Sequence, residues 1–220
     1  MAVETKPFRE LTGKEKLQYF WDYYKFRALA LLLVLLAVPV GVHMLVQRGR
    51  QVDLYCLVWN DISNQGLVDG LERYPSRAGR ELTVSVDNGY PFNDETGEAG
   101  LYWPDDSASI KLMSLEASGQ ADVVIADTPS LLFGVYREFA APLEEALPGE
   151  LLRRLEPYYV YAEFEGEEGG SDGKAYGLDL SGTDFYKENG GTKENAVLFL
   201  PYVSERGQAA ADFVRYVYGM

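Results

Sequence analysis

The sequence predicts an α/β domain with a mostly parallel sheet, preceded by a membrane-spanning helix. Residues 28–46 form an uncharged apolar run of nineteen residues. From residue 52 to the helix expected to begin at 128, strand-like and helix-like periodicities then alternate, as in parallel strands joined by helical crossovers. The segment 121–127 is short and continuously apolar except for its aspartates, which is typical of a buried central strand.

The apolar run has the length of a membrane span. At about 1.5 Å of rise per residue it extends roughly 28 Å, the thickness of a hydrocarbon core. Basic residues near it number five before the run and two after it: Arg9, Lys14, Lys16, Lys25 and Arg27, then Arg48 and Arg50. This bias favours a cytoplasmic N-terminus and a domain outside the cytoplasm.

A cleaved signal peptide is the competing interpretation of this N-terminal region. It is disfavoured because 27 residues precede the apolar run and no small-x-small cleavage site stands out. A core helix of a soluble protein would need an amphipathic face, and this run is apolar all round. We therefore predict a plasma-membrane protein with a cytoplasmic aromatic-basic juxtamembrane helix (1–27), a signal-anchor span (28–46) and an extracytoplasmic domain (51–220).

The charge of the predicted domain excludes a nucleic-acid partner. From Gln51 onward the chain has 12 basic and 30 acidic residues, a net charge of −18. Neutralising phosphates requires a basic face. The acidic surface suits a domain held away from an anionic membrane, and attraction of cationic ligands is the alternative interpretation.

Few residues suited to catalysis are present. The sole histidine, His43, lies in the apolar run, which excludes Ser-His-Asp and Cys-His arrangements and histidine-rich zinc sites in the domain. The single cysteine, Cys56, allows no internal disulfide and alternates within an apolar strand. We predict no enzyme activity, catalytic residue, metal or cofactor, with a hydrolase that uses paired carboxylates as the minor alternative.

Periodicity predicts the elements of the first half of the domain. Strands are expected at 52–59, 81–87 and 121–127, and a loop at 88–105. Helices are expected at 65–74, at 107–118 and from 128, where Pro129 suits the first turn. For the helix at 65–74 we predict an N-cap at Ser63 and a buried face of Leu67, Leu71 and Tyr74. For the helix at 107–118 we predict a buried face of Ile110, Met113, Leu115 and Ala117 and an end at Gly119.

The second half is less regular. A connector is expected at 139–147, a short helix at 149–155, and strands at 158–164 and 174–180 around an acidic loop at 165–173. Segment 183–193 is polar and predicted to be mobile. A last strand (195–203) and a last helix (205–218, with Ala209, Phe213, Val214 and Val217 facing inward) complete the domain.

A candidate binding site follows from the predicted sheet. In open parallel sheets, ligands lie beyond the carboxyl ends of the strands. The polar and aromatic residues at those ends are Trp59, Asn60, Asp61, Asp87, Asp127 and Thr128. The alternative is that these residues only cap helices and form turns.

Four segments resemble type 2 extracytoplasmic solute-binding proteins. Residues 111–127 resemble the family's helix–strand segment, in which "ala-x-gly-x" precedes "ala-asp-val-val". Residues 142–147 are similar to its "pro-leu-asp-asp" element, 174–179 to its "lys-x-tyr-gly-x-pro" strand, and 195–210 to its closing segment. The leader also resembles that of uncharacterised single-span proteins of Gram-positive anaerobes.

The resemblance implies a domain that binds and does not catalyse. It adds Tyr176 and Asp179 to the candidate site, and it implies a small solute as ligand and an ABC permease or other membrane protein as partner. The aromatic ring, amides and carboxylates of the site would suit a sugar or a cationic solute. Because 170 residues leave little room for a second lobe and no lipobox is present, we expect a single lobe anchored by the span. The alternative function is a structural or interaction module, a degenerate binding fold tethered to a membrane complex.

Overall fold

The computed structural model describes residues 52–93, 101–163, 173–202, 204 and 206–220, together with Trp21 and Leu35. The chain divides into two compact units, Met1–Gln51 and Val52–Met220. Apart from Trp21 and Leu35, the predicted juxtamembrane helix 1–27 and span 28–46 lie outside the described residues. Among the residues that are described, no helix has the length and apolarity to cross a membrane.

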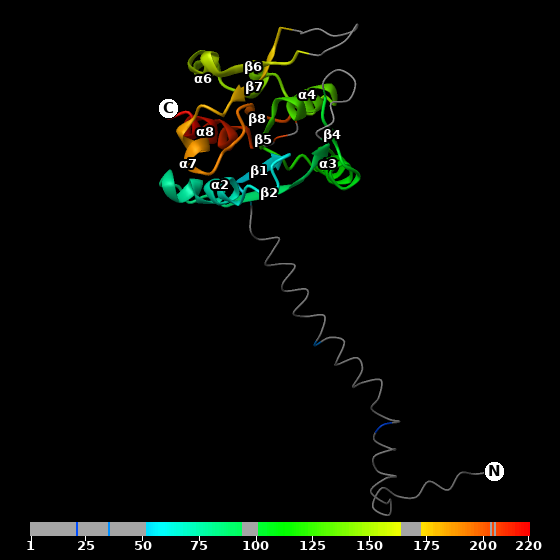
Figure 1. The fold of residues 1–220 in the computed structure, drawn as a ribbon. Coiled ribbons are helices and arrows are strands. Elements are labelled where there is room, and N and C mark those ends of the chain that lie inside the picture. Colours follow the sequence, from blue (N-terminus) through cyan, green and yellow to red (C-terminus); the bar gives the residue numbers. More distant parts are fainter. Residues whose placement is uncertain are drawn as a thin grey trace, which may run out of the picture. The chain divides into compact units, whose positions relative to one another are not determined.

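A six-stranded sheet forms the centre of the second unit (Figure 1). Its order is β2 (Val84–Tyr90), β1 (Leu54–Trp59), β5 (Val123–Asp127), β8 (Ala196–Phe199), β7 (Ala175–Asp179) and β6 (Tyr159–Tyr161). β1 pairs in parallel with β2 and β5, whereas β8 is antiparallel to both β5 and β7, and β6 is antiparallel to β7. The α/β class is therefore confirmed, and the sheet is mixed because both β8 and β6 run against their neighbours.

Two hydrophobic cores lie on opposite faces of this sheet. Alternate residues of β1 point to the two faces, so Cys56 and Val58 belong to one core and Leu57 and Trp59 to the other. α2 (Gln65–Arg77), α6 (Gly149–Leu155), α7 (Asp184–Glu188) and α8 (Gly207–Val217) contribute buried residues to the first core. α3 (Asp106–Ser118) and α4 (Thr128–Tyr136) contribute to the second.

Short elements complete the unit. β3 (Phe92–Asn93) and β4 (Trp103–Pro104) form a separate antiparallel pair, so part of the segment predicted as a loop at 88–105 is strand. α5 (Leu143–Ala146) and the 3₁₀ turn η3 (Glu156–Tyr158) flank α6. The acidic loop predicted at 165–173 lies outside the described residues except for Gly173.

Side-chain caps fix where the helices of the first half begin. The Oδ1 atom of Asn64 accepts a hydrogen bond from the Leu67 amide at 3.0 Å, so the predicted Ser63 cap is wrong by one residue. Asp127 caps α4 through the Ser130 amide. α3 ends as predicted at Gly119, whose φ of 63° lies in the left-handed region that glycine adopts without strain.

Of the predicted buried face of α3, Leu115 is buried, whereas Ile110, Met113 and Ala117 are exposed. The helix buries Ala108, Leu112 and Leu115, which have the i, i+4, i+7 spacing of one face. Ile110 and Met113 are instead 71% and 65% exposed. Packing of α3 against β2 and β4 selects the narrower stripe, and the periodicity of apolar residues alone does not distinguish the two faces.

The segment predicted to be polar and mobile, 183–193, contains α7 and packs into the first core. Phe185 and Tyr186 are buried, and Asn189 lies against α2. A Cβ atom added to Gly70 would lie 2.3 Å from Cγ of Asn189. The glycine therefore permits the close approach of this segment to the helix.

Candidate functional site

The carboxyl ends of four strands lie along one edge of the sheet. β1, β2, β5 and β7 run in the same direction, and β8 begins at this edge, where Ala196 pairs with Asp127 and Val197 with Asp179. Five of the predicted site residues end these strands or directly follow them: Trp59, Asn60, Asp127, Thr128 and Asp179. Asp61 follows one residue later, whereas Asp87 and Tyr176 lie within their strands.

The position along this edge where a ligand-binding crevice is expected lies between β1 and β5. The chain leaves β1 to reach β2 on one side and later returns through α3 to β5 on the other side, with α2 and α3 on opposite faces (Figure 1). Ligands in open α/β sheets bind at such switch points. The residues that end the two strands here, Asn60 and Asp127, are in direct contact.

Asn60 and Asp127 are joined by a hydrogen bond. Nδ2 of Asn60 donates to Oδ2 of Asp127 at 2.8 Å. Asn60 has a φ of 55°, a left-handed conformation that asparagine tolerates better than most residues. Its backbone N–H donates to the carbonyl oxygen of Tyr90 at the end of β2. The turn after β1 therefore holds the side-chain amide of Asn60 over the end of β5.

Lys193 binds both of these residues. Its Nζ atom donates to Oδ2 of Asp127 at 2.7 Å and to the carbonyl oxygen of Asn60 at 2.5 Å. The side chain of Asp127 is only 4% exposed, whereas that of Lys193 is 25% exposed. The other carboxylate oxygen accepts from the amide and the hydroxyl group of Ser130.

Sequence reasoning missed Lys193. It lies 66 residues from Asp127 and 133 from Asn60, in a segment predicted to be mobile. No local pattern marks it. A buried aspartate that ends a central strand needs a positive partner, but that requirement does not single out one of the chain's basic residues.

Three other predicted residues form hydrogen bonds within the protein. Asp61 accepts from Nδ2 of Asn64 at 2.9 Å, and Asp179 accepts from the amide and hydroxyl group of Ser181. The hydroxyl group of Thr128 contacts the Asn195 carbonyl at 3.3 Å. For Asp61 and Asp179 the contacts are those of the turn-and-cap alternative, whereas Thr128 donates to a residue that directly precedes β8.

The remaining predicted residues lie apart from the contact of Asn60 with Asp127. Trp59 is 1% exposed, and its ring stacks on Phe92 and Phe139 with centroid distances of 5.3 and 5.4 Å. Tyr176 is buried in the same core. Asp87 accepts hydrogen bonds from the amide of Gly89 and the phenol of Tyr90, and burial together with the Asp87 charge raises the pKa of that phenol.

A second buried carboxylate, Asp122, lies just before β5 and therefore at the opposite edge. It accepts from the Tyr55 amide at 2.7 Å, the Ser204 hydroxyl at 2.8 Å and Nε of Arg206 at 2.8 Å. Arg206 also donates to the carbonyl oxygens of Val52 and Gln120. This cluster joins the starts of β1, β5 and α8, so its charges hold the fold together.

The described residues offer little for covalent or metal chemistry. In this part of the chain, no three His, Cys, Asp or Glu side chains are grouped so that they could hold a metal ion. Cys56 is buried, and burial followed by the nearby Asp122 charge raises the pKa of its thiol. The thiol therefore remains protonated near neutral pH and is a weak nucleophile.

Comparison of the chain with protein-family models and with curated protein sequences gives no match.

Proposed function

We propose that the domain is a non-catalytic binding domain that resembles one lobe of a type 2 solute-binding protein. In this proposal, the span at 28–46 anchors it to the plasma membrane, the domain lies outside the cytoplasm, and its partner is an ABC permease or another membrane protein. The ligand binds at the carboxyl edge of the sheet and carries an ammonium group. The observation that carries the proposal is the contact of Lys193 with Asp127 and Asn60 at the switch point.

The Lys193 contacts favour a cationic ligand over a sugar. An alkylammonium ligand that displaces Lys193 makes the same bonds to the buried carboxylate and to the Asn60 carbonyl. A neutral sugar would instead leave the carboxylate of Asp127 buried without a positive partner, which is costly. Lys193 lies outside any helix or strand and is partly exposed, so it is suited to being displaced.

Ligand-dependent thermal stabilisation tests this proposal. The full-length protein in detergent micelles is heated with putrescine, a lysine-containing peptide or glucose, at matched ionic strength. A ligand that binds the folded state raises Tm by an amount set by its concentration relative to Kd. We expect the two amines to raise Tm and glucose to leave it unchanged.

Two variants locate the effect. Asp127→Asn should reduce the rise in Tm, whereas Asp179→Asn, which changes a carboxylate at the same edge, should retain it in full. An equal rise with the Asp127 variant, or stabilisation by glucose alone, would overturn the assignment of the ligand site.

The proposed topology is tested by adding protease to intact cells. The protease should degrade the domain and spare a tag at Met1, and the reverse result would overturn the proposed topology.

The alternative, an interaction module, is favoured by a different surface. Ile110, Met113, Trp103 and Tyr136 are 71%, 65%, 42% and 59% exposed on or beside α3 and α4. Contiguous exposed apolar residues often mark protein contacts. If this function holds, Met113→Lys should abolish co-migration with a membrane complex on native gels without changing Tm, and amines should not stabilise the protein.

A further inference from the structure

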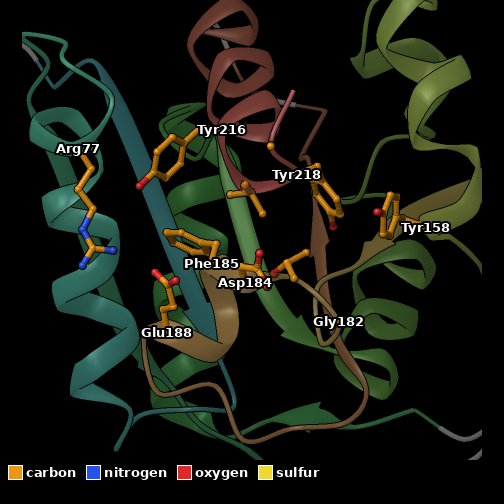
Figure 2. A pocket seen from close by; sticks show the side chains of 11 residues that line it. Arg77, Tyr158, Gly182, Asp184, Phe185, Glu188, Tyr216 and Tyr218 are labelled. Atoms are coloured by element: carbon orange, nitrogen blue, oxygen red, sulfur yellow. The ribbon is translucent and has the colours of Figure 1, made fainter.

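The second candidate site is a pocket on the face of the sheet covered by α2 and α8. It has a volume of about 360 Å³ and is formed where the ends of these helices meet α7 and η3 (Figure 2). Ligand pockets typically measure about 300–1,000 Å³. Neither Asn60, Asp127 nor Lys193 lines it, so it is separate from the contact at the switch point.

The pocket combines aromatic rings with charges of both signs. Its aromatic residues are Tyr158, Phe185, Tyr216 and Tyr218, and its charged residues are Arg77, Asp184 and Glu188. Figure 2 shows Arg77 and Glu188 reaching toward one another from α2 and α7, with Tyr158 and Tyr218 on the other side. Rings and charges thus face the same hollow.

The three charged side chains are not used by the fold. Within the part of the chain that the structure describes, Arg77, Asp184 and Glu188 form no ion pair or side-chain hydrogen bond. The contrast with the carboxylates of Asp122 and Asp127 is clear, because every oxygen of those two groups accepts a bond from the protein. The charges of the pocket are therefore available to a ligand.

Each of these groups recognises a different part of a ligand. A guanidinium group binds a carboxylate through two parallel hydrogen bonds. Carboxylates bind ammonium groups, and aromatic rings attract cations over their faces. Because the three charges of the pocket sum to −1, a ligand with one carboxylate and two ammonium groups complements all of them.

We propose that this pocket binds a basic α-amino acid. Arg77 binds the α-carboxylate, and Asp184 and Glu188 bind the two ammonium groups. The rings of Tyr158, Phe185, Tyr216 and Tyr218 surround the aliphatic part. The site is independent of the contact of Lys193 with Asp127, and it gives the domain a ligand chemistry beyond simple amines.

Calorimetric titration of the full-length protein in detergent micelles tests the proposal. The probes are L-lysine, cadaverine, which lacks the carboxylate, and 6-aminohexanoate, which lacks the α-ammonium group. We expect L-lysine to bind most tightly, with each analogue weaker by about tenfold (about 1.4 kcal/mol), because each analogue lacks one charged group that the pocket binds.

The variants separate this site from the rest of the protein. Arg77→Gln should weaken L-lysine about tenfold and leave cadaverine unchanged, whereas Glu188→Gln should weaken both. Arg73→Gln is the matched control, because Arg73 is exposed one turn earlier on α2 and does not line the pocket. It should bind all three probes like the unmodified protein.

Other outcomes would overturn the proposal. These are the absence of L-lysine binding at millimolar concentration, equal binding of cadaverine and L-lysine, and unchanged L-lysine binding by Arg77→Gln. Loss of L-lysine binding in Asp127→Asn but not in Arg77→Gln would assign the ligand to the carboxyl edge. That result would reject the second pocket while supporting the proposed function.

Discussion

Replacing Lys193 with alanine removes the ammonium group that neutralises the buried carboxylate of Asp127. Removing one partner of a buried ion pair costs about 3–5 kcal/mol. Here Lys193 is 25% exposed, so water reaches the vacated side of the pair. Asp127 also retains its bonds from Asn60 and Ser130. We therefore expect a loss of about 2–3 kcal/mol in the free energy of unfolding.

The expected change in Tm follows from the size of the domain. For a domain of 150–250 residues, 1 kcal/mol shifts Tm by about 2–4 °C, so Lys193→Ala should lower Tm by about 4–12 °C. Thermal unfolding is followed by circular dichroism. The matched control is Lys187→Ala, because Lys187 is exposed and donates to the Gly182 carbonyl at 2.9 Å without contacting a buried charge. The control should lower Tm by less than about 4 °C.

Chemical rescue makes the same experiment a test of the site. Ethylammonium fits the space left by the lysine side chain, and at ten times its Kd it should restore about 1.4 kcal/mol. It should raise Tm of Lys193→Ala more than that of Lys187→Ala, with sodium chloride as the ionic-strength control. The reasoning is refuted if the two variants lose equal stability, or if ethylammonium stabilises both equally.

Three further predictions concern the fold around the site. Asp122→Ala should lower the free energy of unfolding in urea by about 3–5 kcal/mol, and the isosteric Asp122→Asn should cost less because it retains hydrogen bonds; equal losses would contradict a contribution of those hydrogen bonds. Gly70→Ala should cost about 1–3 kcal/mol by displacing Asn189, and unchanged urea unfolding would contradict the close approach. Cys56 should react with a thiol reagent only as fast as the domain unfolds, because it is buried with a raised thiol pKa; rapid labelling of the folded protein would contradict this.

Sequence patterns predicted the first half of the domain well because its signals are local. The apolar runs of β1 and β5 are long enough to be recognised as strands, and Gly119 ends a helix by its own backbone preference. Boundaries were less accurate: β2 was expected at 81–87 and lies at Val84–Tyr90. The register of an edge strand depends on its pairing partner, which periodicity does not reveal.

In the second half, the elements predicted at 149–155, 174–180 and 205–218 are confirmed as α6, β7 and α8, but their arrangement could not be predicted because it depends on distant contacts. β8 inserts between β5 and β7 and is antiparallel to both, and no property of its own sequence fixes that position. Segment 183–193 is polar in composition, yet Phe185 and Tyr186 anchor it in the first core. The same holds for the candidate site. Asn60 and Asp127 could be predicted because they stand at the ends of predicted strands, whereas no local signal predicts Lys193.

The two charged sites differ in how much of their electrostatic energy the fold itself uses. At the switch point, Lys193 satisfies Asp127 in the absence of any ligand, so an incoming cation gains only the difference between two similar contacts. In the second pocket, Arg77, Asp184 and Glu188 are solvated until a ligand arrives. The binding free energy of a ligand there is its full interaction with these groups, less the cost of desolvating them. A ligand of equal chemistry should therefore bind the second pocket more tightly than the switch point. Comparing the Kd of L-lysine in Asp127→Asn and Arg77→Gln measures this difference, and a larger loss in the Asp127 variant would reverse the ranking.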